Sequence, residues 1–367
     1  MKVTFPHMGN LWISVKSLFE GLNLEVVVPP PCSARTMELG VRHSPEFACL
    51  PLKINMGNFI EALENGADTI VMAGGWGPCR FGYYAQVEKD ILVDLGFKFR
   101  LIVLEAPDSR LQDLIKQLKL LGQNVSFFKV VQAIRLGWEK LKAVDELESK
   151  LRYYLPRVLD PDRAEKVFAE GLKKVDRANT SMEIREAVLA TSDELGGLPQ
   201  NGCTPLRIGL VGEIYTLLEP ASNLRVERRL GRLGAEVKKT VSLPQWVNDH
   251  LLGGVLKVGS CREAVACSSP YLNDWVGGHG RETVGYTVQL ARQGFDGVVQ
   301  VGPLTCMPEI VAQSVLGKVS QVEGIPVMTM YFDEQSAEAG VQTRLEAFID
   351  MVRHRKRMNN GSLFSCT

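Results

Sequence analysis

Long apolar runs and an excess of either charge are both missing from this chain of 367 residues. No stretch approaches the ~20 consecutive apolar residues that a transmembrane helix needs, and the opening MKVTF has no charged and apolar leader. Lysine plus arginine and aspartate plus glutamate both number 42, so bulk charge favours neither nucleic acid nor an anionic membrane as a partner. We therefore expect a cytoplasmic protein that binds neither.

Several familiar cofactor motifs are also missing. No two cysteines have the Cys-x-x-Cys spacing, which excludes ferredoxin-type and zinc-ribbon sites, so any metal site must draw its ligands from distant segments. Neither the Gly-x-Gly-x-x-Gly fingerprint nor a Walker loop occurs, so the GGHG loop at 277–280 gives only weak support for phosphate binding. His279 in this loop is a candidate cofactor-binding residue, although a lone histidine more often packs or caps a helix.

Hydrophobic patterning predicts an α/β fold with two Rossmann-like parallel-sheet halves joined by a helical insert. Short apolar strands alternate with amphipathic helices in both terminal regions, starting with strand 3–6, helix 11–21 and strand 24–28. The middle of the chain is rich in Leu, Lys and Glu at helical spacing. The predicted parts are an N-terminal α/β domain at 1–109, a helical insert and linker at 110–200, and a C-terminal α/β domain with a final helix at 201–367.

One pattern of residues occurs twice, once in each predicted half. It consists of Gly-x-Asp, a short apolar strand, and a Gly-Pro loop that ends in cysteine. The first strand, 69–73, leads to Cys79, and the second, 297–301, leads to Cys306. Because ligands bind at the carboxyl ends of strands in open parallel sheets, each half is predicted to hold a thiol at its ligand-binding edge. Our hypothesis is that the two halves face each other across a metal cluster.

Cys49, Cys79 and Cys306 are the predicted metal ligands, because each lies in a loop constrained by proline or glycine rather than on an apolar stripe. Soft thiolates suit iron-sulfur clusters or zinc, whereas a single intracellular cysteine is more often a small buried hydrophobe. Three thiolates can hold three irons of a 4Fe–4S cluster and leave the fourth iron open. Cys32, which follows three prolines at the end of strand 24–28, is the fourth candidate ligand.

The remaining cysteines are Cys203, Cys261, Cys267 and Cys366. We expect them to be structural or incidental, and keep Cys261 and Cys267 as reserve ligands for a second metal. Arg80, with Tyr83 or Tyr84, follows Cys79 at the turn into a predicted helix. A guanidinium and backbone N–H groups at such a turn can hold an anion or donate to cluster sulfides. We therefore add Arg80 and Tyr83 as cofactor-binding candidates, although an ordinary helix start explains them equally well.

Longer segments around these residues resemble a known family. They are PEFACLPLK, GGWGPCRFGYY, VGGHGRETVGY, GPLTCMPEI and YFDEQSAEAGVQTRLEAF. The chain resembles the activase-related proteins of the 2-hydroxyacyl-CoA dehydratase superfamily, which also contains benzoyl-CoA reductase subunits and double-cubane cluster proteins. The resemblance covers both predicted α/β halves and little of the helical insert.

The resemblance implies α/β domains that hold an iron-sulfur cluster through three cysteines, which by position are Cys49, Cys79 and Cys306. It also implies oxygen sensitivity, an anaerobic host and a separate ATP-hydrolysing activase that supplies low-potential electrons. A double-cubane cluster needs about six thiolates, and the sequence leaves open whether Cys32, Cys261 and Cys267 complete such a set.

We therefore expect an iron-sulfur protein that accepts electrons from a separate activase for the reduction or dehydration of a small substrate. A non-catalytic iron-sulfur carrier or scaffold for a partner enzyme is the alternative, and a zinc-stabilised structural protein is a third reading. The sequence leaves open whether the chain is itself an enzyme, whether it binds CoA esters and whether it forms a homodimer.

Overall fold

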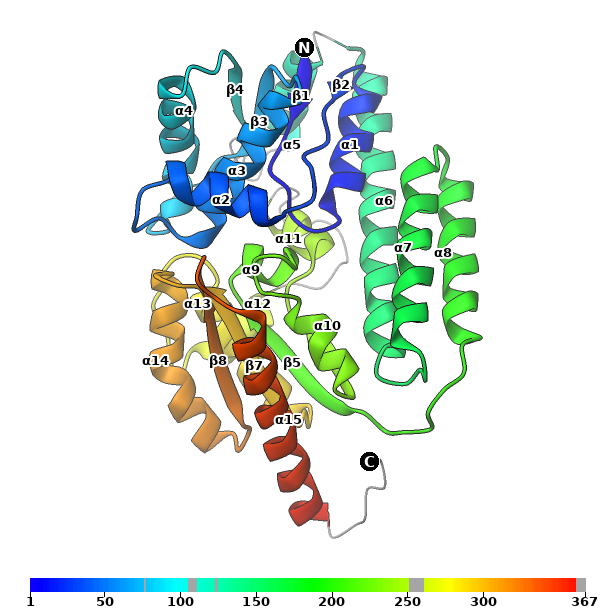
Figure 1. Cartoon of the computed structure of the whole chain (residues 1–367), viewed down its shortest axis with the longest axis vertical. Coiled ribbons are helices and arrows are strands. Elements are labelled where there is room, and N and C mark those ends of the chain that lie inside the picture. The colour runs from blue at the N-terminus through cyan, green and yellow to red at the C-terminus, as the bar shows by residue number, and fades with distance from the viewer. Residues whose placement is uncertain (76, 105–110, 123–124, 251–260, 361–367) are drawn as a thin grey trace. The chain divides into compact units, whose positions relative to one another are not determined.

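The computed structural model describes residues 1–75, 77–104, 111–122, 125–250 and 261–360 (Figure 1). Trp76 of the first glycine-rich loop and Cys366 therefore lie outside the described residues. The chain forms two compact units. The first comprises Met1–Asp145, Lys173–Ala187 and Ser242–Ser260, and the second comprises Glu146–Leu172, Val188–Val241 and Cys261–Thr367. Residues 110–200, the predicted helical insert, are thus divided between both units.

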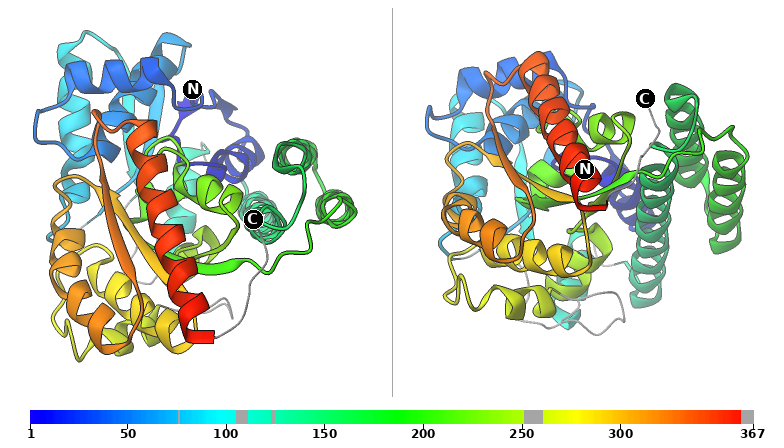
Figure 2. Two further views of the ribbon diagram at one scale, coloured as in Figure 1. Left: turned by 60° about the horizontal axis from the view of Figure 1, so that its bottom comes forward. Right: turned by 90° about the horizontal axis from the view of Figure 1, so that it is seen from below.

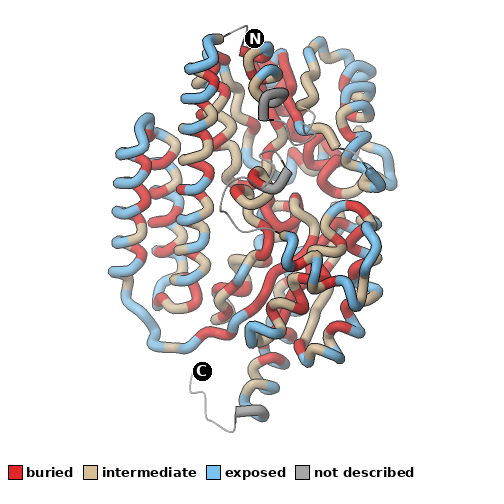
Figure 3. The backbone as a smooth tube through the Cα atoms, turned by 180° about the vertical axis from the view of Figure 1, so that it is seen from behind, coloured by how far each residue is buried: buried red, intermediate tan, exposed pale blue. Residues whose placement is uncertain are grey.

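The first unit alternates strands and helices. Its elements are β1 (Lys2–Thr4), α1 (Leu11–Gly21), β2 (Glu25–Val26), α2 (Ala34–His43), α3 (Leu50–Glu64), β3 (Thr69–Ala73), the 3-10 helix η1 (Arg80–Tyr83), α4 (Tyr84–Asp94), β4 (Arg100–Leu104), α5 (Leu111–Leu121) and α11 (Leu243–His250). Three helices belong partly to each unit: α6 (Phe127–Tyr154), α7 (Pro161–Arg177) and α8 (Ser181–Gly196). Figure 3 shows buried and exposed turns alternating along these helices, as amphipathic helices require.

The second unit repeats the alternation. Its elements are β5 (Leu206–Gly212), α9 (Ile214–Leu218), α10 (Val226–Arg232), β6 (Ala235–Lys239), α12 (Arg262–Ser268), α13 (Gly280–Arg292), β7 (Gly297–Pro303), α14 (Met307–Val322), β8 (Val327–Phe332) and α15 (Glu338–Asn360). Among the described helices of the chain, none combines the length and the apolar character needed to cross a membrane.

Both units have the same sheet topology, which confirms the predicted α/β fold of two Rossmann-like halves. The strand orders are β2-β1-β3-β4 and β6-β5-β7-β8, and every pairing is parallel. Val3 pairs with Thr69 in the first sheet, and Ile208 pairs with Gly297 in the second. Strands β3 and β7 hold the same place in their sheets, so Cys79 and Cys306 follow equivalent strands.

In the first unit the alternation of side chains along β3 separates two cores. Ile70 and Met72 pack among residues of α3 and α4, including Phe59 and Leu92. Val71, between them in sequence, packs on the other face with residues of α1, α5 and α6. Successive residues of a strand point to opposite faces, so a continuous apolar run is what a strand covered on both faces requires.

The second sheet is also covered on both faces, as the two views of Figure 2 show. A side chain at Gly209 of β5 would collide with Leu290 of α13, whereas one at Gly297 of β7 would collide with Phe348 of α15. Helices α13 and α15 therefore press on opposite faces, and glycine in each strand permits the close approach. This is the doubly wound arrangement that βαβ crossovers produce.

Helices α2 and α3 pack unusually closely through two glycines. A Cβ atom built on Gly40 would lie 1.8 Å from the Lys53 carbonyl oxygen, and one on Gly57 would lie 1.9 Å from the Thr36 carbonyl oxygen. Backbone atoms cannot move aside as a flexible side chain can. The two glycines therefore set the distance between α2 and α3, and with it the position of the Cys49 loop that precedes α3.

A half-buried cluster of four charges joins α6, α10 and β6 in the second unit. Lys239, whose side chain is 5% exposed, lies 3.1 Å from Glu148 and 3.7 Å from Glu227. Arg152 lies 3.6 Å and 3.5 Å from the same two carboxylates. Two cations thus share two carboxylates, and removal of one cation would leave buried negative charge incompletely compensated.

The sequence prediction was wrong for several stretches. Residues 243–270 include α11 and α12, two helices that the sequence analysis did not predict. Pro51 was expected in a loop, yet it is the second residue of α3, where a missing N–H costs nothing. Pro308 likewise lies in the first turn of α14, a helix that the sequence analysis did not predict. Proline in a first helical turn was thus misread as a sign of a loop.

Candidate functional site

In open parallel sheets, ligand sites form where the crossover direction reverses between neighbouring strands. This reversal falls between β1 and β3 in the first unit and between β5 and β7 in the second. In the first unit, His7 lies in the loop after β1 and Cys79 in the loop after β3. In the second unit, Glu213 directly follows β5 and Cys306 lies in the loop after β7. Each unit therefore has a cysteine in the loop at its own switch point.

Two of the predicted ligands, Cys49 and Cys79, lie in loops that contact each other within the first unit. Directly after Cys79, the Arg80 guanidinium donates from Nη1 to the Phe47 carbonyl oxygen at 2.8 Å. The Tyr84 hydroxyl forms a hydrogen bond with the Cys49 thiol. Both thiols are half-buried, and Cys49 is the N-cap residue of the 15-residue α3. A helix N-terminus favours negative charge, so this position suits a thiolate.

Tyr84, rather than the predicted Tyr83, is the tyrosine that reaches a thiol. Tyr83 is 69% exposed, whereas Tyr84 is buried and its ring meets that of Phe81 edge to face. One turn further along α4, burial raises the pKa of the Glu88 carboxyl well above its usual value, and the nearby Asn55 side chain offsets only part of the rise. A phenol and a tightly held acidic proton thus line the buried side of α4.

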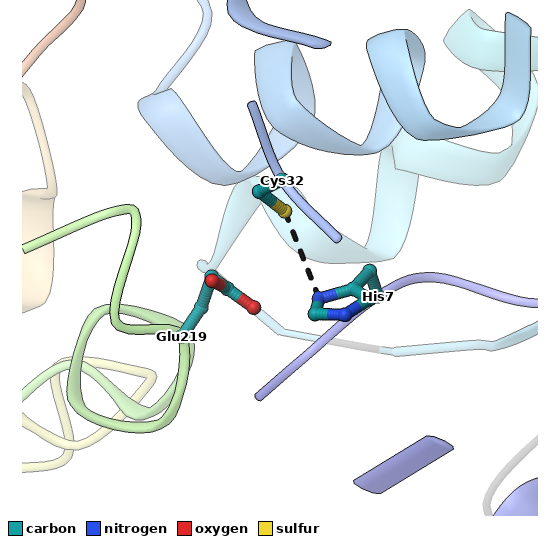
Figure 4. A group of neighbouring side chains, drawn as sticks. All are labelled: His7, Cys32 and Glu219. Atoms are coloured by element: carbon teal, nitrogen blue, oxygen red, sulfur yellow. Dashed lines mark hydrogen bonds between the residues drawn. The ribbon is translucent and has the colours of Figure 1, made fainter. Parts of the chain in front are cut away.

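Cys32 lies against a histidine that the sequence analysis did not single out. Its Sγ is 3.7 Å from Nδ1 of His7 (Figure 4). The same Sγ is 3.6 Å from Oδ1 of Asn58. His7 is 7% exposed and Asn58 is fully buried, while the Cys32 thiol is half-buried. Imidazole nitrogen and thiol sulfur are both common metal donors, so the first unit contains a pair of side chains able to hold a metal.

Glu219, the third residue labelled in Figure 4, belongs to the second unit and is described with it. It is 2% exposed and follows the short helix α9. Its carboxylate accepts the backbone N–H of Ala221 at 3.0 Å, and its backbone carbonyl accepts the Ser222 hydroxyl at 2.7 Å. These bonds make Glu219 part of the turn that leads toward α10.

In the second unit, the loops that carry Cys306 and His279 pack together. Cys306 is the N-cap residue of the 16-residue α14, and His279 is that of α13. A Cβ atom on Gly280 would lie 2.7 Å from the carbonyl oxygen of Pro308, in the first turn of α14. Thr305, just before the cysteine, has a φ of 69°, which a residue with a side chain seldom adopts. The glycines of the GGHG loop therefore serve close packing beside the Cys306 loop.

Glu309, three residues after Cys306, is fully buried in a network of polar side chains. The Thr283 hydroxyl lies 3.1 Å from both carboxyl oxygens, and Nε2 of Gln300 donates to one of them at 2.8 Å. The Gln300 carbonyl in turn accepts the Thr329 hydroxyl at 2.8 Å. Burial raises the pKa of Glu309 to about 8, and the carboxylates of Glu213 and Glu282 add to the rise. The network thus holds a carboxylic acid that is mostly protonated at neutral pH.

Tyr331 interacts electrostatically with both Glu309 and Cys306. Burial raises the pKa of Tyr331, and the negative charges of Glu309 and Cys306 raise it further. Its hydroxyl oxygen is inaccessible to solvent and has no hydrogen-bond partner among the described residues. The Cys306 region of the second unit therefore contains two O–H groups whose pKa values are raised, one on a phenol and one on a carboxylic acid.

The structure groups the predicted site residues by unit. Cys49, Cys79 and Arg80 come together in the first unit, where Cys32 has its own contacts, and Cys306 and His279 have neighbouring loops in the second. Of the reserve cysteines, Cys261 caps α12, and Cys267 packs against an apolar cluster around α13 and α14. The main residues that sequence reasoning missed are His7 and Glu309. Tyr84 was named beside Tyr83, but its contact with Cys49 was not predicted. Of the two missed residues, His7 had a signal in the sequence, because it directly follows the predicted strand 3–6.

A comparison of the chain with models of known protein families gives no match. A comparison with curated proteins also gives no match.

Proposed function

We propose that this chain is an iron-sulfur protein that accepts low-potential electrons from a separate ATP-hydrolysing activase and uses them to reduce or dehydrate a small substrate. The contact between the Cys49 and Cys79 loops within one unit carries this proposal. The third cysteine, Cys306, follows the equivalent strand of the other sheet, and the segments around all three resemble cluster-binding segments of the 2-hydroxyacyl-CoA dehydratase superfamily.

The donor set fits an iron-sulfur cluster chemically. Cys49, Cys79 and Cys306 are half-buried thiols on short loops after strands or before helices, where backbone N–H groups can donate to sulfur. Tyr84 adds a hydroxyl that is hydrogen-bonded to the sulfur of Cys49. A bound 4Fe–4S cluster supplies one-electron transfer at low potential. The protein side chains hold the thiolates in place and shield them partly from water.

Metal analysis of anaerobically purified protein tests the ligand assignment. Iron, acid-labile sulfide and zinc are counted per chain in the wild type and in Cys49→Ser, Cys79→Ser and Cys306→Ser. Each variant should lose most of its iron and its brown colour while staying folded by circular dichroism. Cys267→Ser, a change of the same type in a half-buried cysteine, is the control and should keep its iron. Wild-type iron content in all three variants, or zinc in place of iron, would contradict the proposal.

The activase partner is tested separately from the ligands. Because the sequence has no Walker loop, calorimetry with Mg-ATP should show no heat of binding to this chain. The protein should instead become reduced, by EPR, when ATP and a catalytic amount of activase are added. Sub-micromolar ATP binding by this chain alone would mean that the ATPase belongs to this chain, and it would refute the proposal of a separate activase. Reduction without turnover of any substrate would identify a carrier.

A further inference from the structure

Cys32 and His7 form a second group of reactive side chains in the first unit, separate from the contacts of Cys49 and Cys79. The Cys32 Sγ atom lies 3.7 Å from Nδ1 of His7 (Figure 4) and 3.6 Å from Oδ1 of Asn58. These distances are within reach of hydrogen bonds that involve sulfur. Cys32 is half-buried, whereas His7 and Asn58 are buried, so Cys32 is the most exposed of the three residues.

The local backbone fixes all three side chains. Three consecutive prolines precede Cys32 and stiffen the approach to it. Directly after it, Ser33 caps α2 and its backbone N–H donates to the Thr36 side chain at 3.0 Å, a reciprocal capping box. The Asn58 Nδ2 atom donates to the Pro30 carbonyl at 3.4 Å, which turns Oδ1 toward the thiol. The thiol therefore donates to Oδ1 of Asn58 and lies beside Nδ1 of His7 instead of sampling many rotamers.

This geometry is that of a nucleophile with an adjacent base. A thiolate is the reactive form of cysteine, and a neighbouring imidazole generates it by accepting the thiol proton. The place in the fold fits as well, since His7 follows β1 and Cys32 follows β2, both at the carboxyl edge of the sheet where ligands bind. Asn58 can accept the thiol hydrogen bond in the resting state, and His7 Nδ1 can accept the proton when the sulfur reacts.

We propose that Cys32 and His7 are a nucleophilic thiol site for small carbon electrophiles that carry a leaving group. In the reaction the Cys32 sulfur forms a bond to the electrophilic carbon. The bond from that carbon to the leaving group breaks, and the leaving group departs with the electron pair. The thiol proton passes to Nδ1 of His7, so no oxidant or reductant is consumed. The site does not depend on the cluster ligands of the proposed function.

Alkylation with iodoacetamide, followed by peptide mapping, tests this site on the full-length protein under anaerobic conditions. Rates are measured for every cysteine in one sample, with half-buried Cys267 as the internal reference. Cys32 should react at least about tenfold faster than Cys267, and His7→Gln should remove most of that advantage while the Cys267 rate stays unchanged; positioned bases contribute factors of this size or more. Equal rates in the wild type, or an unchanged ratio in His7→Gln, would overturn the proposal.

The same map distinguishes a nucleophile from a metal ligand. A nucleophilic Cys32 reacts at the same rate before and after iron is removed by chelation, and Cys32→Ser leaves the iron content unchanged. Protection of Cys32 that disappears on chelation, or loss of iron in Cys32→Ser, would make it a ligand and overturn the proposal. Protection of Cys49, Cys79 and Cys306 in the same samples reports independently on the proposed function. If His7→Gln does not fold, the wild-type ratio and the chelation result still decide the question.

Discussion

Replacing Glu309 with glutamine should make the protein more resistant to alkaline pH. The acid is fully buried, and burial, with the charges of Glu213 and Glu282, raises its pKa from the usual 4.5 to about 8. Because the folded-state pKa is raised, the stability that the protonated acid contributes is fully present below 4.5. It is lost progressively as the pH rises through about 8. Glutamine has the same shape, cannot ionise and has no such loss.

The magnitude follows from the pKa shift. The full shift from 4.5 to about 8 corresponds to about 5 kcal/mol between the acid and alkaline limits, at about 1.4 kcal/mol per unit. Between about pH 6 and about pH 9, the wild type should lose about 3 kcal/mol of unfolding free energy relative to Glu309→Gln. The glutamine carbonyl can accept from Gln300, as Glu309 does, and its amide can donate to the Thr283 hydroxyl, so the variant should fold normally.

Urea unfolding of wild type and variant at the two pH values measures this difference. All other titrating groups are common to both proteins and cancel when the two free energies are subtracted. Glu170→Gln, the same change at an exposed helix position, is the control and should show no pH-dependent difference. A wild-type minus Glu309→Gln difference that stays flat over this range would refute the reasoning, because it would mean that Glu309 titrates alike in the folded and unfolded chains.

Four further variants test helix packing, the buried charge cluster and the Cys49 contact. Gly57→Ala should destabilise the protein by at least about 2 kcal/mol in urea unfolding, because the new Cβ would lie 1.9 Å from the Thr36 carbonyl oxygen. Gly317→Ala is the control: no atom lies within 4 Å of its new Cβ, so it should stabilise α14 by up to about 1 kcal/mol. Lys239→Met should lower the melting temperature and cost about 3 kcal/mol, since Glu148 and Glu227 lose the cation that lies between them. No change would show that the remaining cations, Arg152 among them, compensate the two glutamates. Tyr84→Phe should keep the iron content but shift the EPR spectrum of the reduced protein, because the thiol loses its hydroxyl partner; an identical spectrum would contradict a role in tuning.

Much of the fold follows from local patterns in the sequence. The bounds of β3 were predicted residue for residue, because a short apolar run flanked by glycine and aspartate favours a strand in an α/β chain. The duplication of Gly-x-Asp, strand and Gly-Pro-Cys was enough to predict two sheets of one plan. Helix starts that contain proline, as in α3 and α14, were missed because the first turn of a helix and a stiff loop share the same residues.

The candidate sites were predictable only in part, for a physical reason. Loop composition marked Cys49, Cys79 and Cys306, since glycine and proline at a strand end are visible in the sequence itself. The partners of each thiol come from elsewhere in the chain, as Tyr84 does for Cys49 and His7 does for Cys32. Which side chains meet is decided by strand order and by the close packing of helices, and neither is a property of any local segment. The sequence alone therefore determined which loops bear the thiols, and the tertiary structure decided what surrounds each one.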